Sequence, residues 1–109
     1  MKAKPVKREG KTDIPCAPEE ADAVWLHCPG PFPNRRIPVI LRGERRGTGC
    51  WSWNGDTERP TLRPSILSTG HTESGAFRCH SFVSEGRIEF LMDCSHAHRG
   101  QTLDLLDVD

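Results

Sequence analysis

The chain has 109 residues with 15 basic and 15 acidic side chains, so its formal net charge at pH 7 is zero. This length predicts a single domain. Because no net charge draws the protein to nucleic acid or to a membrane surface, we expect neither as a partner. No apolar run approaches the roughly 20 residues that span a bilayer, and no apolar stretch of the signal-peptide kind follows the N-terminus. We therefore expect a cytoplasmic protein.

The first twenty residues, MKAKPVKREGKTDIPCAPEE, are polar and show no hydrophobic period. All four lysines of the chain lie in the first eleven positions, and prolines interrupt the segment. Polar chain ends of this kind often lack fixed structure. We predict a flexible N-terminal arm over residues 1–20 and a single small β domain over residues 21–109, with at most one helical turn in PEEADAVWL.

Short β-branched or aromatic runs, separated by glycine and proline, follow in chain order. They are AVWLHC (23–28), IPVILR (37–42), GCWSW (49–53), PSILS (64–68), FRCHSFV (77–83), RIEFLMD (87–93) and TLDLLDV (102–108). All have the length of a strand, and no segment keeps a helical period for three turns. The pattern predicts an all-β fold of mostly short antiparallel strands, a small sandwich or barrel with little helix.

A hairpin over residues 77–93 is the clearest local structure, and we expect it at the centre of the fold. Glu85 and Gly86 form its turn, so Ser84 pairs with Arg87. Since side chains alternate along a strand, one apolar face carries Cys79, Val83, Ile88, Phe90, Met92 and Cys94, and we assign it to the core. The other face carries Arg78, His80, Phe82, Glu89, Leu91 and Asp93. There His80 lies diagonal to Asp93, within reach of a hydrogen bond.

A candidate catalytic serine ends the proline-bearing stretch ERPTLRPS (58–65). Proline stiffens the backbone that presents Ser65. The chain then doubles back through a glycine-containing turn, which makes residues 65–68 a neighbour of the strand 77–83. Ser65, His80 and Asp93 are thus a candidate nucleophile, base and orienting acid. The alternative is a turn serine and an ordinary surface pair of histidine and aspartate.

Cysteine and histidine residues suggest a competing, metal-binding interpretation. Cys28, Cys79, Cys94 and His96 supply the thiolate and imidazole ligands that zinc prefers. A Cys-x-x-Cys pair is absent, however, because Pro31 ends the motif HCPGP. Buried cysteines also serve as small core hydrophobes. We therefore expect no bound metal and no other cofactor.

Trp51 and Trp53 lie two residues apart, so their indoles share one face of a strand. Asn54 and Gly55 follow as a turn. Paired indoles can line a groove for an extended peptide, although more often one fills the core and the other shields an edge. We treat both tryptophans as candidate substrate-binding residues.

The motifs WSWNG, ERPT, PSIL, CHSFV and GRIEFLMDCSHAHRGQT follow one another over residues 51–102. In this order they resemble a small family of phage and bacterial genomes that is often mislabelled as ammonia monooxygenase. One branch of it is similar to the BubE component of bacterial ubiquitination-like (Bub) operons. The resemblance implies a serine peptidase that trims or deconjugates the C-terminal tail of a ubiquitin-like protein.

The resemblance also implies roles for single residues. The family's serine and histidine correspond to Ser65 and His80. Asp93 fits the acid, with Glu58 as the alternative, and His96 matches the family's last histidine and is an alternative base. At HCPGP the family has a second cysteine where this chain has proline. The alternative function is a non-enzymatic β module, zinc-stabilised through cysteine and histidine, that binds a partner protein. The sequence indicates no oligomeric state.

Overall fold

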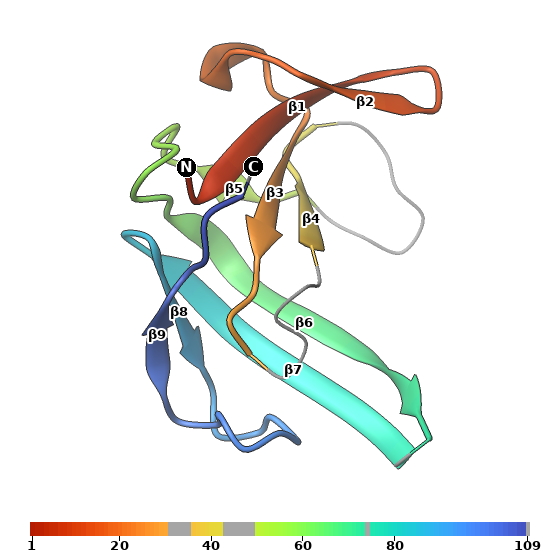
Figure 1. Cartoon of the computed structure of the whole chain (residues 1–109), viewed down its shortest axis with the longest axis vertical. Coiled ribbons are helices and arrows are strands. Elements are labelled where there is room, and N and C mark those ends of the chain that lie inside the picture. Colours follow the sequence, from red (N-terminus) through yellow and green to blue (C-terminus); the bar gives the residue numbers. More distant parts are fainter. Residues whose placement is uncertain (31–35, 43–49, 74, 109) are drawn as a thin grey trace.

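The computed structural model describes residues 1–30, 36–42, 50–73 and 75–108, and these form two antiparallel sheets (Figure 1). The first sheet has the order β2-β1-β3-β4 and the second the order β5-β6-β7-β8-β9. The strands of the first are β1 (Ala3–Glu9), β2 (Thr12–Pro15), β3 (Ala23–His27) and β4 (Arg36–Ile40). Those of the second are β5 (Ser52–Trp53), β6 (Leu62–Thr72), β7 (Gly75–Ser84), β8 (Arg87–Phe90) and β9 (Thr102–Asp104). The predicted all-β fold is confirmed.

Helical structure in the described ranges is limited to one 3₁₀ turn, Pro18–Glu20, between β2 and β3. It starts at a proline and carries two acidic residues in its only turn. None of the helical structure described is long and apolar enough to cross a membrane.

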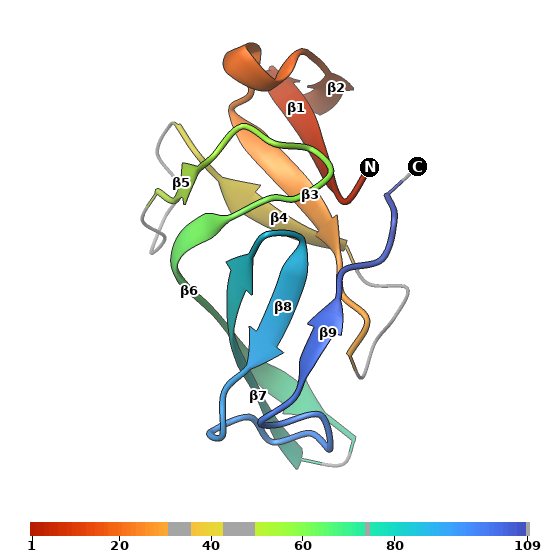
Figure 2. The ribbon, with the colours of Figure 1, turned by 90° about the vertical axis from the view of Figure 1, so that its left-hand side faces the viewer.

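The hydrophobic core lies between the two sheets, which Figure 2 shows with the first sheet above the second. Its fully buried side chains come from both, among them Leu26 of β3, Leu62 of β6 and Phe90 of β8. Burying an aliphatic or aromatic side chain of this size contributes about 1.5–3 kcal/mol. The shared core packs the second sheet against the first and so fixes the position of the side chains on the outer face of the second sheet.

Residues 1–20, which we expected to form a flexible arm, instead supply two strands of the first sheet. Ala3 and Val6 are 0% and 4% exposed, and they pair with Leu26 and Ala23 of β3. Gly10, with a positive φ of 62°, allows the turn into β2. The buried side chains of β1 are small and stand between lysines, so the hydrophobic signal of this strand was too weak to see.

The hairpin of β7 and β8 has the predicted register, with Ser84 opposite Arg87. Its core face is buried as expected, except for Met92, which is 71% exposed. The assignment of Met92 to the core was wrong because β8 ends at Phe90. Beyond that residue the chain turns, and the alternation of a strand no longer applies.

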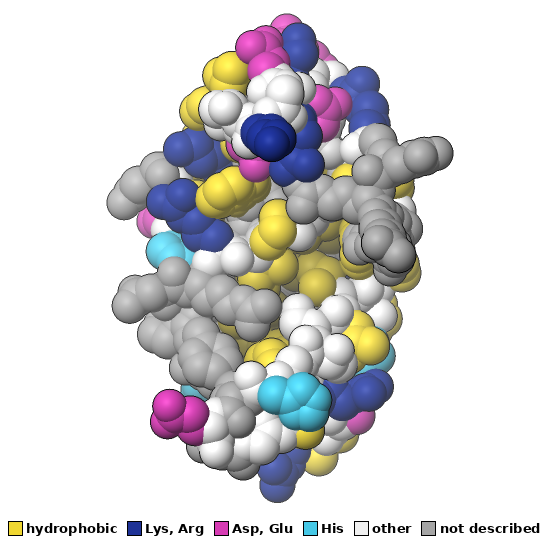
Figure 3. Space-filling model, turned by 90° about the vertical axis from the view of Figure 1, so that its right-hand side faces the viewer, with side chains coloured by type: hydrophobic (Ala, Val, Ile, Leu, Met, Phe, Trp, Pro, Cys, Tyr) yellow, Lys and Arg dark blue, Asp and Glu magenta, His cyan; other side chains and the backbone are white. Residues whose placement is uncertain are grey.

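The surface opposite the view of Figure 2 is shown in Figure 3. Hydrophobic side chains are visible at its centre, and Lys and Arg side chains are more frequent towards the end that carries the first sheet. That end contains β1 and β2, where the lysines of the chain lie. The lysines are therefore gathered at the end of the first sheet, whereas the second sheet carries arginines, namely Arg63, Arg78 and Arg87.

Candidate active site

Ser65 lies in β6 where the pairing with β7 is irregular. The register shifts between Leu62 and Ile66, and regular pairing resumes with Leu67 opposite His80. Leu67 is half exposed, so this register position faces outward. Ser65 precedes Leu67 by two residues and shares its face, which places the serine diagonal to His80.

The loop that leads into β6 is tied to itself by two side chains. The Oδ1 atom of Asn54 accepts hydrogen bonds from the backbone N–H groups of Asp56 and Thr61. The Oδ1 atom of Asp56 accepts from those of Glu58 and Arg59, at 2.8 and 2.9 Å. The bonds from Arg59 and Glu58 lower the pKa of Asp56. These hydrogen bonds hold the loop that contains Pro60, the first of the two prolines before Ser65.

Ser65, His80 and Asp93, called the triad below, are joined by hydrogen bonds across the outer face of the second sheet. The Oγ atom of Ser65 is 2.9 Å from Nε2 of His80. The Nδ1 atom of His80 is 3.0 Å from Oδ2 of Asp93 and 3.3 Å from Oδ1. When Nδ1 donates its proton to the carboxylate, Nε2 is left as an acceptor for the serine hydroxyl. The imidazole is 24% exposed, which leaves room for a reacting group.

Arg78 holds the carboxylate of Asp93 from the other side. Its Nε and Nη2 atoms both lie 2.9 Å from Oδ2. Its backbone is fastened as well, because Ser95 Oγ accepts from the N–H of Arg78 and donates to its carbonyl. Partial desolvation raises the pKa of Asp93, but hydrogen bonds from His80 and Arg78 outweigh it and the pKa is lowered. The predicted register placed Arg78 near Asp93, but from the sequence we assigned no role to Arg78.

His96, the alternative base, lies on the opposite side of β7. Its Nε2 atom is 3.4 Å from Sγ of Cys79, and its ring packs edge-on against Phe90 with centroids 4.9 Å apart. Cys79 and His80 are adjacent in a strand, so they point to opposite faces. Burial, and to a smaller degree His98, lower the pKa of His96. The structure does not bring His96 to Ser65.

Glu58, the alternative acid, is also apart from the triad. Its carboxylate is 70% exposed and lies 3.8 Å from the amino group of Met1. The acid that accepts a hydrogen bond from His80 is Asp93.

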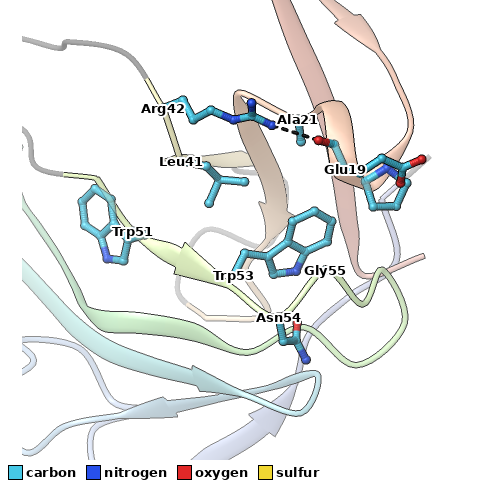
Figure 4. Close-up of a pocket in the computed structure, with 9 residues that line it drawn as sticks. Glu19, Ala21, Leu41, Arg42, Trp51, Trp53, Asn54 and Gly55 are labelled. Carbon is cyan, nitrogen blue, oxygen red and sulfur yellow. Dashed lines mark hydrogen bonds between the residues drawn. The ribbon is translucent and has the colours of Figure 1, made fainter.

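Trp51 and Trp53 line an open pocket of about 430 Å³, whose lining includes no member of the triad (Figure 4). The two indoles stand on either side of Leu41 in this view, and Arg42 donates a hydrogen bond to the carbonyl of Glu19. The indole N–H of Trp51 donates to the carbonyl of Ser65, with 3.3 Å between the atoms. The pocket wall is therefore in direct contact with the backbone of the serine. Both indoles also pack partly against the core.

Of the four suspected metal ligands, the structure brings three together. Ligand atoms of Cys79, Cys94 and His96 all lie within 4.8 Å of one another, and this group could hold a metal ion. Cys28 is buried and its Sγ atom accepts a hydrogen bond from the backbone of Gly30.

A serine, a histidine and an aspartate joined in this order form the arrangement with which serine hydrolases activate a hydroxyl group. The site thus has the form of that class, on a small all-β domain.

The chain belongs to the BubE family. The model of that family, described as "bacterial ubiquitination-like system serine protease (BubE)", matches residues 3–91. The match includes Ser65 and His80 and ends two residues before Asp93. It confirms the resemblance seen in the sequence motifs, and the family is one of serine proteases by this description. No curated protein and no solved structure matches the chain.

Proposed function

We propose that this protein is a serine peptidase that processes or deconjugates the C-terminal tail of a bacterial ubiquitin-like protein. Ser65 is the nucleophile, His80 the general base and Asp93 the group that orients His80. The observation that carries the proposal is the unbroken chain of hydrogen bonds from Ser65 Oγ through the imidazole to the carboxylate. The family description supplies the pathway in which such a substrate occurs.

The chemistry proceeds in two halves. Ser65 Oγ attacks the carbonyl carbon of the scissile bond while Nε2 of His80 takes the hydroxyl proton. The imidazolium, stabilised by Asp93, then protonates the leaving amine, and an acyl-serine remains. In the second half, water attacks the acyl carbon, His80 takes its proton and returns it to Ser65, and the shortened tail leaves as a carboxylate.

An extended tail fits the open edge of β6 next to Ser65. Within the described part of the chain, β5 pairs with β6 at Leu62 and Arg63 only. From Ile66 onward the edge of β6 away from β7 has no paired strand among these residues. A peptide can add to such an edge through main-chain hydrogen bonds. Trp51 and Trp53 would then form one wall of the groove for its side chains.

Labelling with a fluorophosphonate tests the nucleophile. The reagent should modify one serine, which peptide mass spectrometry identifies as Ser65. Ser65→Ala should remove the label, whereas Ser52→Ala, on the neighbouring strand, should keep it. Label on another serine, or label that persists in Ser65→Ala, would refute the assignment.

Cleavage of a tailed substrate tests the substrate class. The substrate is a ubiquitin-like protein of such an operon whose tail is extended by a short peptide. We expect a single cut that yields the mature tail, and no cut by Ser65→Ala. A protein that takes the fluorophosphonate but leaves every tailed ubiquitin-like substrate intact would be a serine hydrolase of another specificity.

A further inference from the structure

The inner face of β7, directly behind the triad, carries a second group of reactive side chains. Cys79 is 8% and Cys94 5% exposed, and His96 closes the group from the loop that follows β8. We propose that Cys79, Cys94 and His96 bind a thiophilic divalent metal ion, with Zn²⁺ as the natural occupant. The proposal is independent of the peptidase activity, because none of the three side chains belongs to the triad.

The spacing of the ligand atoms suits such an ion. Zinc lies about 2.3 Å from thiolate sulfur and about 2.0–2.1 Å from imidazole nitrogen, so the ligand atoms of a tetrahedral site are separated by somewhat less than 4 Å. The three atoms lie within 4.8 Å of one another, and Nε2 of His96 is already 3.4 Å from Sγ of Cys79. Small side-chain shifts therefore suffice to close the site. Three protein ligands leave the fourth position for water or another small ligand.

The backbone around Cys94 favours a thiolate at this position. The N–H group of His80 points at Sγ of Cys94, with 3.2 Å between nitrogen and sulfur. Hydrogen bonds from the surrounding shell orient metal ligands and stabilise their charge. In the metal-free geometry the same sulfur lies 3.2 Å from the carbonyl of His80. That weak S–H donation is given up when the thiol loses its proton to the metal.

The loop presents His96 with its ring held in place. Phe90 packs against the ring edge-on, and the backbone N–H of His98 lies 3.2 Å from Nδ1. Nε2 is thereby aimed at the two sulfurs. Metal binding at Nε2 places the ring proton on Nδ1, so the contact with His98 must open, and this cost lowers the affinity.

The position of the ion follows from the chain neighbours of its two cysteine ligands. Cys79 adjoins His80, and Cys94 adjoins Asp93. A metal held by both sulfurs ties β7 to the loop after β8 immediately behind the hydrogen bond between His80 and Asp93. The ion would thus stabilise the fold at the point where two members of the triad are joined.

The experiment is a titration of the full chain with Co²⁺, whose thiolate charge-transfer absorption reports sulfur ligation, followed by displacement with Zn²⁺. We expect one Co²⁺ per chain, displaced by Zn²⁺, and a rise in Tm with either metal. Cys94→Ser and His96→Gln should weaken binding more than about a hundredfold. Cys50→Ser and His71→Gln, which change a thiol and an imidazole outside the group, should bind as the wild type does.

Three results would overturn the proposal. The first is a wild-type chain that takes up neither metal stoichiometrically and whose Tm neither metal raises. The second is Co²⁺ binding that Cys94→Ser and His96→Gln leave unchanged. The third is a Cys79–Cys94 disulfide, found by peptide mapping of freshly purified protein. Circular dichroism of each variant separates a lost ligand from a lost fold, and no step of the test requires peptidase activity.

Discussion

The two faces of β7 differ in chemistry although the same stretch of chain builds both. On the outer face, partly exposed polar groups are linked by hydrogen bonds in a row. On the inner face, two cysteines are packed into the core and lie beside a partly buried imidazole. The residues that supply the two faces are direct neighbours, Cys79 with His80 and Cys94 with Asp93. Changes on the outer face should therefore act on reactivity, and changes on the inner face on stability.

The largest effect is expected at the serine and histidine of the outer face. Ser65→Ala or His80→Ala should lower kcat/KM for tail cleavage at least about ten-thousandfold, and the double variant should be little worse, because the residues act as a unit. Tm should change little in each. The matched control is His71→Ala, which removes an exposed imidazole from β6. A double variant far below both single ones would contradict the triad.

Asp93→Asn should do less damage, since it misorients His80 without removing it. We expect the loss in kcat to be about a hundredfold smaller than that of Ser65→Ala. Single-turnover kinetics with the tailed substrate measure it. Equal losses in the two variants would mean that Asp93 does more than orient the imidazole.

On the inner face, Phe90→Ala should reduce the free energy of unfolding by about 3–5 kcal/mol, because it empties the centre of the core. Chemical denaturation measures this loss, and the variant that remains folded should keep the wild-type kcat. Leu67→Ala, at an exposed position opposite His80, serves as the control and should cost less than about 0.5 kcal/mol. A stable Phe90→Ala protein with a reduced kcat would contradict the prediction that changes on the inner face act on stability alone.

Arg78 should have a moderate effect as a positioning residue. Arg78→Met removes both bonds to Oδ2 of Asp93 and should lower kcat about tenfold to a hundredfold, with KM little changed. Arg78→Lys should recover part of the rate. Arg87 lies in the other strand of the hairpin, and Arg87→Met, which removes a similar exposed bond to Asp104 of β9, should leave kcat unaltered. A change in KM alone would assign Arg78 to substrate binding.

The smallest effect is expected at Asp56, outside both faces. Its folded-state pKa lies below the usual 3.8, so its contribution to stability is present above about pH 4 and is lost as pH falls through the folded pKa. Asp56→Ala should lower Tm by no more than a few degrees at pH 6. At pH 3 the difference between wild type and Asp56→Ala should shrink. A Tm difference between the two proteins that grows on acidification would contradict the predicted direction of the pH dependence.

The sequence predicted the strands of the second sheet and the register of its main hairpin, because glycine at the turn and strict alternation leave few choices. We expected His80 beside Asp93 from a continuation of that register, but β8 ends at Phe90 and the turn that follows brings Asp93 to His80. The meeting of Ser65 with His80 was a weaker prediction, since it depends on where the irregular pairing of β6 ends. The residue types around Ser65 do not indicate where the register between β6 and β7 shifts.

Other features required the fold itself. β1 was not predicted because its partner β3 supplies most of the apolar surface, while β1 contributes small side chains between lysines. Met92 was misplaced because the end of β8 depends on the loop that follows. In the sequence, the metal ligands and the triad are neighbouring residues, so metal binding and catalysis were alternative interpretations of the same segments. The folded sheet places the two groups on opposite faces.

The hydrogen bond from the indole of Trp51 to the carbonyl of Ser65 makes this tryptophan an optical reporter of the serine. Indole emission responds to the hydrogen bond and to water near the ring. A ligand in the pocket displaces that water, and acylation of Ser65 alters the carbonyl that the indole touches. With Trp25 and Trp53 replaced by phenylalanine, the remaining emission would follow pocket filling and acyl transfer in the same sample, as two phases separated in time.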